Sequence, residues 1–279
     1  MAVHIQNQMY WLYLSPSKYT MTYNTRSTNM ENTNPFENPP SKSEFSGYWI
    51  PSHNAKVIKE GITSNKAPFL PDANGNIKAE PVYSLSQGYC LPATRLIPVQ
   101  FEKMDKGYRS NIVATRRQIT DAGNSLKDGE KGVLYNFKGK DDNIHTTALF
   151  FPEQTENPQS VIDRAKEKIQ PRGNLKEIDM KITSGKPVEY LGTYIAACKG
   201  GMRLSVSPEI AEEFKNNMMT HVSNDLKKSG EKNRDIDSVG NILFNADRRS
   251  TEILKTLALE QATSHSPQKA KKQEMEVCF

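Results

Sequence analysis

The sequence predicts an α+β fold, in which a small mixed domain precedes a second small αβ domain. Apolar residues recur every three or four positions in several stretches of the C-terminal half, as they do on one face of a helix. Two shorter runs at 133–137 and 144–151, rich in aromatic and β-branched residues, are typical of strands. Polar residues dominate both ends of the chain, which we expect to be disordered.

The composition indicates an ordered centre that is shorter than the chain. The 279 residues are 36% hydrophobic and have a mean hydropathy of −0.69, below the values of a compact globular domain. We therefore expect a disordered leader at residues 1–46 and a charged tail at residues 264–279. The net charge of +5, from 37 Lys and Arg against 32 Asp and Glu, suits a polyanionic partner without requiring one.

Cysteine usage and hydropathy predict a soluble, cytoplasmic protein without a membrane partner. Cys90, Cys198 and Cys278 lie far apart and form no CxxC pair, so we expect reduced thiols and no zinc ribbon. The apolar run in the opening MAVHIQNQMYWLYL is far shorter than the ~20 residues of a membrane span.

The first predicted elements are extended. Tyr48–Ile50 is predicted as a core edge strand in preference to an aromatic platform for a nucleotide base. The pair Asn74-Gly75 predicts a turn between extended pieces. The stretch 88–101 alternates apolar residues with prolines, which favours an edge strand.

The segment from Gly107 to Gln154 is the centre of the functional prediction. A helix is expected from Ser110 or Asn111, with Ile112, Val113 and Ile119 as its apolar positions and Gly123 just beyond its end. In the turn at 127–132, Gly129 and Gly132 permit positive φ and leave backbone N–H groups open to an anion, although an ordinary turn needs the same glycines. The strands 133–137 and 144–151 follow as a hairpin.

The C-terminal half is predicted to be mainly helical. Helices are expected at 158–169, from Pro187 to Gly200-Gly201, and at 208–226, with strands at 175–182 and 203–206. A last helix at 246–262 carries Ile253, Leu254, Leu257 and Leu259, which dock either on the body of the protein or on a partner.

Sequence motifs of catalysis are absent, so we expect no enzyme, no cofactor and no metal. The chain has no HExxH, no GxxxxGK[ST] and no GxSxG, and its five histidines are scattered. His221 lies beside the apolar stripe of a predicted helix, where a lone histidine is usually a hydrogen-bonded structural residue.

What remains is a basic surface interleaved with tyrosines. Cations neutralise phosphates and tyrosine faces stack unpaired bases, although on composition alone a merely solvated face is favoured. The candidate DNA-binding residues are Tyr108, Arg109, Arg116, Arg117, Lys127, Lys131 and Tyr135, with Gly123, Gly129 and Gly132 as structural turn residues.

The order of residues in this segment resembles the N-terminal domain of the ArdC antirestriction proteins. The match runs without gaps through GEKG at 129–132 and ends with Leu149-Phe150 and Gln154. Its earlier positions are Gly107, Tyr108, Ser110, Thr115, Gln118, Gly123, Leu126 and Lys127. Val113 and Phe151 replace the family's tryptophan and asparagine, and no counterpart of an earlier Tyr-Arg-Gly-Ile-Asn element surrounds Tyr89.

The resemblance covers about residues 47–157, which we therefore predict to be a DNA-binding domain followed by a small α/β domain of unknown role at 158–263. It implies single-stranded DNA binding by a protein of a plasmid, phage or conjugative element. The zinc peptidase that follows in the family is not implied, because its HExxH is missing. The alternative is a protein-binding inhibitor or adaptor that acts on a host defence protein through the second domain and the last helix.

Overall fold

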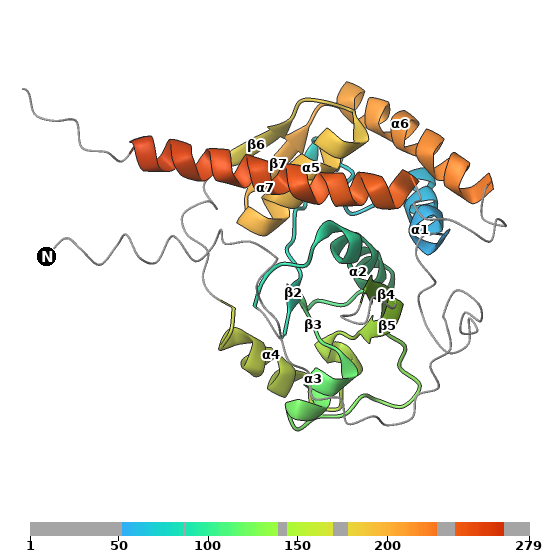
Figure 1. Ribbon diagram of the computed structural model, residues 1–279, viewed down its shortest axis with the longest axis vertical. Coiled ribbons are helices and arrows are strands. Elements are labelled where there is room, and N and C mark those ends of the chain that lie inside the picture. Colours follow the sequence, from blue (N-terminus) through green and yellow to red (C-terminus); the bar gives the residue numbers. More distant parts are fainter. Residues whose placement is uncertain (1–51, 86–87, 139–143, 170–177, 228–237, 265–279) are drawn as a thin grey trace, which may run out of the picture. The chain divides into compact units, whose positions relative to one another are not determined.

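In the computed structural model, the residues described are 52–85, 88–138, 144–169, 178–227 and 238–264 (Figure 1). The predicted leader at 1–46, the Tyr48–Ile50 strand and all of the predicted tail beyond Ser264 lie outside this range.

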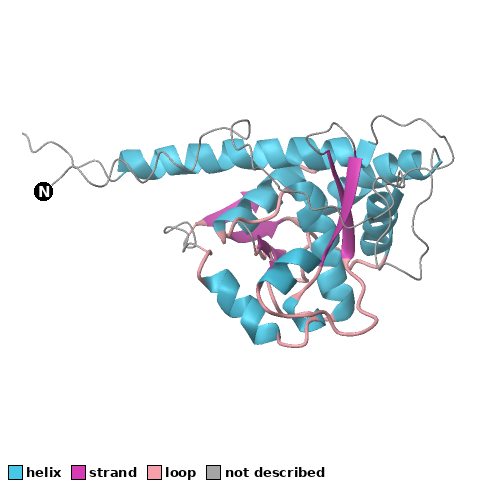
Figure 2. Cartoon of the chain, turned by 60° about the horizontal axis from the view of Figure 1, so that its bottom comes forward, coloured by secondary structure: helices cyan, strands magenta, loops and turns pink. Residues whose placement is uncertain are grey.

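Helices and short strands are mixed along the chain, so the predicted α+β class is confirmed (Figure 2). The helices are α1 (Ser52–Thr63), α2 (Ala93–Lys106), α3 (Arg116–Asp121), α4 (Pro158–Lys166), α5 (Pro187–Gly200), α6 (Pro208–Lys227) and α7 (Ser238–Ser264), with a 3-10 turn η2 (Pro152–Gln154). The strands are β1 (Asn76–Ile77), β2 (Tyr83–Ser84), β3 (Ile112–Val113), β4 (Val133–Lys138), β5 (Ile144–Leu149), β6 (Asp179–Ile182) and β7 (Arg203–Val206).

The strands form three small sheets. In the three-stranded sheet β7 is central, antiparallel to β1 and parallel to β6. Strands β2 and β3 pair in parallel, and β4 and β5 form the predicted antiparallel hairpin, in which Val133 lies opposite Leu149. The first sheet therefore joins a strand from the N-terminal part of the chain to two strands from the C-terminal part.

Helix α5 lies at the centre of the main core. It is apolar around most of its circumference, as expected for a helix that is covered on all sides. Tyr190 stacks on Phe214 of α6 with ring centroids 3.9 Å apart, and its hydroxyl donates to the carbonyl of Phe69 at 3.0 Å. Helix α7 packs along α5, as Figure 1 shows. Burial of each side chain as large as Phe214 contributes roughly 1.5–3 kcal/mol.

The buried residues of both predicted domains meet in this core. Phe69, Val113 and Phe151 belong to the same packed cluster as Tyr194 and Phe214. A smaller cluster packs α4 against α3 and the hairpin, and so also draws from both sides of the predicted boundary at residues 157 and 158. Independent folding of the two predicted domains stays a prediction.

The predicted edge strand at 88–101 is wrong, because Ala93–Lys106 forms helix α2. Pro92 is the N-cap residue, a position that needs no N–H, and Pro98 lies inside the helix. The loss of one backbone hydrogen bond at Pro98 is offset by the burial of Ala93, Leu96, Ile97 and Gln100, which share a helical face.

The predicted helix from Ser110 or Asn111 begins too early. Ile112 and Val113 form strand β3, and the helix α3 begins at Arg116. Thr115 caps it in a capping box: Thr115 accepts from the N–H of Gln118 at 3.4 Å, and the Gln118 side chain accepts from the N–H of Thr115 at 2.9 Å. Gly123 has a φ of +70° just beyond the C-cap, as predicted.

The remaining elements agree with the sequence prediction, with shifted ends. Helix α4 ends at Lys166, strand β5 ends at Leu149, and α7 begins at Ser238 and not at Ala246. Of the strand predicted at 175–182, residues 175–177 lie outside the described residues. Gly75 has a φ of +80°, which confirms the predicted Asn74-Gly75 turn. Within the described ranges, none of the helices combines the length and apolar character needed to cross a bilayer.

Candidate nucleic-acid interface

The turn at 127–132, which we call the GEKG turn, is anchored by Gln154. The N–H of Lys127 donates to the Gln154 carbonyl at 2.9 Å. The buried Gln154 amide donates to the Glu130 carboxylate at 2.9 Å and to the Lys131 carbonyl at 2.8 Å. The conformation of the turn therefore depends on a side chain more than twenty residues away.

The two glycines of the turn have different roles. Gly129 has a φ of +76° and open space around it, so its requirement is conformational. Gly132 has no positive φ; a Cβ there would lie 2.8 Å from Cβ of Ala148 and 2.9 Å from the Leu149 carbonyl oxygen. The prediction of a positive φ at Gly132 is therefore wrong, and the residue is needed for close packing against strand β5.

Glu153 links Arg109 to the GEKG turn. Its carboxylate oxygen Oε1 accepts from the N–H groups of Arg109 at 2.8 Å and Ser110 at 2.6 Å. Its carbonyl accepts from the Lys127 ammonium at 2.9 Å. Arg109 and Lys127, both predicted site residues, are thus held on one hydrogen-bonded scaffold through η2.

Of the other predicted cations, Arg116 and Arg117 are exposed to solvent, whereas Lys131 is half-buried. Arg116 and Arg117 are exposed on helix α3, where Arg117 lies 3.8 Å from the Asp121 carboxylate. Because both partners of that pair are well exposed, the pair contributes little to stability. Lys131 is half-buried beside Gln154. The exposed cations of the candidate interface are therefore Arg109, Arg116, Arg117 and Lys127.

The two predicted tyrosines are both half-buried. The Tyr108 ring lies 4.8 Å from the Phe151 ring. Burial, with the nearby carboxylates of Glu130, Glu102 and Glu153, raises the pKa of Tyr108 to about 12, so its phenol is neutral at physiological pH. The guanidinium of Arg95 lies 4.6 Å from the centroid of the Tyr135 ring. Arg95 therefore occupies one face of Tyr135, and the ring also packs against the main core.

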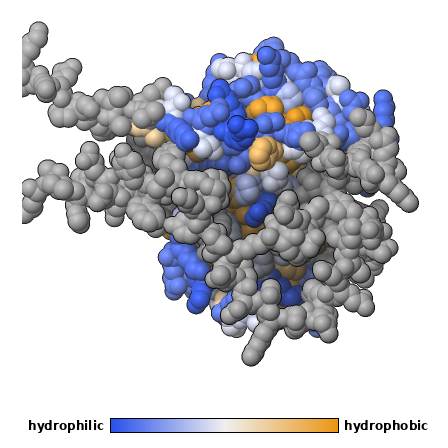
Figure 3. All heavy atoms as spheres, viewed as in Figure 1, coloured by the Kyte–Doolittle hydropathy of each residue, from blue (hydrophilic) through white to orange (hydrophobic). Residues whose placement is uncertain are grey.

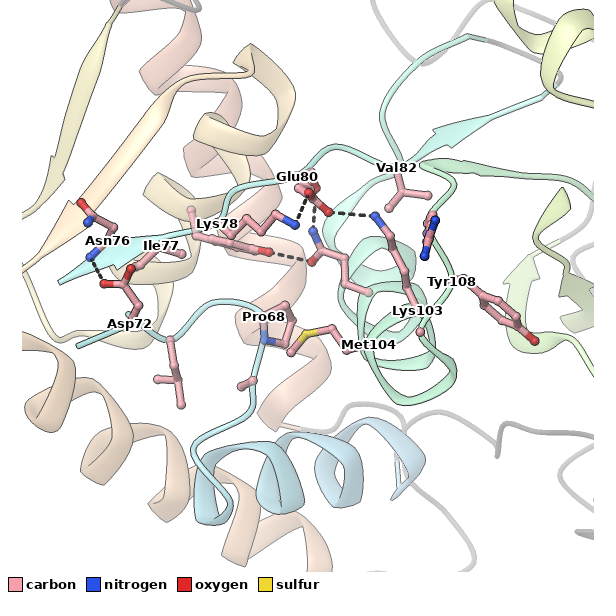
Figure 4. Close-up of a pocket in the computed structure, with 16 residues that line it drawn as sticks. Pro68, Asp72, Asn76, Ile77, Lys78, Glu80, Val82, Lys103, Met104 and Tyr108 are labelled. Carbon is pink, nitrogen blue, oxygen red and sulfur yellow. Dashed lines mark hydrogen bonds and ion pairs between the residues drawn. The ribbon is translucent and has the colours of Figure 1, made fainter. Parts of the chain in front are cut away.

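A pocket of about 870 Å³ opens beside the candidate interface (Figure 4). It lies between the 67–82 segment and the end of α2, and Tyr108 and Arg109 are among its lining residues. The full lining is Ala67, Pro68, Leu70, Asp72, Asn76, Ile77, Lys78, Glu80, Val82, Gln100, Lys103, Met104, Gly107, Tyr108, Arg109 and Tyr194.

Glu80 is the centre of a polar network in this pocket. Its carboxylate binds the ammonium groups of Lys103 at 2.8 Å and Lys78 at 2.7 Å (Figure 4). Burial alone raises the pKa of the Glu80 carboxyl, but the hydrogen bonds from Lys103 and Lys78 outweigh it and hold that pKa below its ordinary value. Lys103 also donates to the Asn111 side chain. Gln100 donates to the Glu80 carbonyl at 2.7 Å and accepts from the Tyr194 hydroxyl at 2.9 Å.

Several of these residues were not predicted from the sequence. Gln154 closes the ArdC-like pattern, but nothing in the pattern assigns it the role of anchor. Glu153 carries no local signal, since its partners lie 43 and 44 residues away. The sequence predicts a strand at Arg95, whereas helix α2 brings this residue to Tyr135.

His221 has a hydrogen-bond partner, and the described residues include no cluster of metal ligands. His221 binds the Ser238 hydroxyl through Nδ1 at 2.6 Å, as expected for a structural histidine. Among the described residues, no three His, Cys, Asp or Glu side chains gather as a metal site.

Residues 58–179 match the family model of the N-terminal domain of anti-restriction factor ArdC. The part of the chain that carries the GEKG turn, Glu153 and most of the pocket therefore matches the ArdC N-terminal domain model, and the resemblance seen in the sequence is confirmed for it. The match begins eleven residues later than the predicted limit of 47 and extends beyond the predicted limit of 157 to residue 179.

Among solved structures, the metal-free crystal structure of the antirestriction ArdC protein from plasmid R388 is similar to this chain. The two chains share 10% sequence identity with a TM-score of 0.49, and the alignment covers 76% of this chain and 99% of the other. No curated protein sequence matches the chain.

Proposed function

We propose that the chain is a non-catalytic, single-stranded-DNA-binding protein of a mobile genetic element, with a role in antirestriction or in the protection of transferred DNA. The observation that supports this proposal best is the cationic surface of Arg109 and Lys127, which one scaffold holds inside the ArdC-type domain. Exposed cations on a rigid backbone bind phosphates without reading sequence.

The physical basis of the proposed binding is electrostatic. Each cation that contacts a phosphate releases condensed counterions, so the logarithm of the binding constant falls by about 0.7 per contact for each tenfold rise in salt. Arg109, Arg116, Arg117 and Lys127 are exposed and available for such contacts. Because the tyrosines are half-buried, the cations are expected to supply most of the affinity and base stacking a smaller part.

Fluorescence anisotropy of a labelled oligothymidylate tests the proposal. We expect binding that weakens steeply between about 50 and 200 mM salt. Substituting Lys127→Gln should lower affinity about equally for all sequences and make the salt slope shallower by about one contact. Arg248→Gln, on an exposed position of α7, is the matched charge control and should bind like the unchanged protein. An absence of binding at low salt, or binding that ignores salt, would contradict the proposal.

One observation favours the second candidate function, a protein-binding adaptor or inhibitor that acts on a host defence protein. Phe244 on α7 is 59% exposed. Figure 3 shows a mainly hydrophilic face with a few apolar patches. However, Ile253, Leu254 and Leu257 pack against the core, so these three residues dock on the body of the protein; the Leu259 side chain lies outside the described residues. Retention of a host protein after nuclease treatment, lost on Phe244→Ser, would favour this candidate.

A further inference from the structure

The pocket beside the candidate interface has the size and lining of a ligand site. Its volume of about 870 Å³ is within the roughly 300–1,000 Å³ range of small-molecule sites. Two of the residues predicted to bind DNA, Tyr108 and Arg109, line it. We propose that the pocket takes an unpaired nucleotide of the bound single strand; this inference rests on the proposed function and names the part of the strand that enters the protein.

The walls of the pocket provide apolar surface for a base. Pro68, Ile77, Val82 and Met104 line it, and the Met104 side chain extends toward Pro68 (Figure 4). Met104 is 50% exposed, so its side chain is accessible to a ligand. A nucleobase needs apolar contact on its two faces, and a flexible thioether adapts to any of the four bases.

Hydrogen bonds within the protein hold the polar groups of the pocket in place. Lys103 is only 12% exposed in its side chain and is bound to Glu80 and Asn111. The carbonyl of Glu80 is held by Gln100, which is held in turn by the Tyr194 hydroxyl. The Lys103 ammonium and the Glu80 carboxylate, with 12% and 32% of their side chains exposed, therefore lie on the pocket wall as a donor and an acceptor for the edge of a base.

Two exposed cations line the pocket, and one of them, Arg109, is linked to the GEKG turn through Glu153. Lys78, with 83% of its side chain exposed, and the exposed Arg109 are both lining residues. Within the described residues the Arg109 guanidinium has no carboxylate partner, so it is available to a phosphate. The backbone of Arg109 is bound by Glu153, and Glu153 binds Lys127. A phosphodiester backbone that passes Lys127 and Arg109 can therefore place the neighbouring base in the pocket.

Filling the pocket tests the inference. We expect Met104→Trp, which occupies the space of the base, to weaken binding of the labelled oligothymidylate about ten-fold at constant salt, because one buried base contact is lost. The salt slope should not change, since the number of phosphate contacts is the same. Met104→Leu, which adds little volume, should bind distinctly more tightly than Met104→Trp. Thermal unfolding of each variant shows whether the fold is intact.

A second measurement does not depend on the Met104 variants. An oligothymidylate with one internal 2-aminopurine should change its fluorescence on binding, because the modified base leaves its stacked neighbours and enters the pocket. Arg109→Gln should reduce this change and weaken binding, whereas Arg248→Gln, which does not line the pocket, should do neither.

The outcomes separate the inference from the proposed function. If the unchanged protein binds no oligonucleotide, the proposed function fails and the inference fails with it. If Lys127→Gln weakens binding but Met104→Trp binds like the unchanged protein, and 2-aminopurine fluorescence does not change on binding, the inference is overturned and the proposed function stands.

Discussion

At the scale of single residues, Gln154 connects three parts of the candidate interface. Its amide oxygen accepts from the N–H of Phe151 at 2.9 Å, while its amide nitrogen donates to Glu130 and Lys131. Gln154 is 1% exposed, so water cannot replace these partners if the side chain is removed. The buried amide therefore stabilises the fold and the GEKG turn together.

We expect Gln154→Leu to lower the free energy of unfolding by about 1–3 kcal/mol, because the Phe151 N–H and the Lys131 carbonyl lose their partner in a buried site. Urea denaturation at neutral pH measures this change. The control is Gln159→Leu, because among the described residues the exposed Gln159 side chain binds an exposed carboxylate, that of Asp163. Equal stability of the two variants would show that the Gln154 hydrogen bonds contribute little.

The sequence predicts which types of residue form the candidate site, but not the contacts between them. The cations Arg109 and Lys127 were identified by type and local order, and both are exposed. Their connection through Glu153 was not predictable, since it depends on a hydrogen bond across more than forty residues of chain. The half-burial of Tyr108 also depends on Phe151, which reaches it only in the folded state.

At the scale of elements, helix starts were predicted best where a proline occupies the first helical position, as in α4, α5 and α6. Asn157 accepts from the N–H of Ser160 at 3.3 Å, and the helix α4 begins at the predicted residue. Helix α2 was missed because Pro92 and Pro98 suggest extended structure, while the burial that stabilises the helix comes from residues far along the chain. Local signals thus predict ends, and tertiary packing decides ambiguous segments.

The capping box of α3 gives a prediction at this scale. Thr115→Ala removes the acceptor for the Gln118 N–H in a helix of six residues, so we expect a loss of about 1 kcal/mol in the free energy of unfolding. Thr115→Ser keeps the hydroxyl and should retain most of the stability. Because α3 carries Arg116 and Arg117, the alanine variant should also bind oligonucleotide more weakly at low salt. Chemical denaturation and anisotropy on the same samples measure both effects, and a Thr115→Ser variant as unstable as Thr115→Ala would exclude the cap as the cause.

At the scale of the whole molecule, residues on both sides of position 157 pack into one core. Phe69 makes edge-to-face contacts with Phe101, Tyr194 and Phe214, at centroid distances of 6.0, 6.2 and 5.5 Å. Two of these three partners lie in the C-terminal helices α5 and α6. A chain cut after residue 157 exposes the face of Phe69 that those helices cover.

We therefore expect a fragment of residues 47–157 to lack a cooperative thermal unfolding transition, whereas a fragment of residues 47–264 unfolds cooperatively. The physical reason is that the shorter fragment buries too little apolar surface to balance its conformational entropy. Differential scanning calorimetry and near-ultraviolet circular dichroism compare the two fragments. A sharp transition in the shorter fragment would show that the residues predicted as the DNA-binding domain fold by themselves.

The position of β7 between β1 and β6 has a consequence for synthesis of the chain on the ribosome. Strand β1 ends at Ile77, and its partner residue Leu204 is made more than a hundred residues later. At about 5–20 residues per second, the nascent β1 waits on the order of ten seconds for the strand that covers it. During that interval the unpaired strand and Phe69 are open to chaperones, so the three-stranded sheet is completed only after β7 has been made.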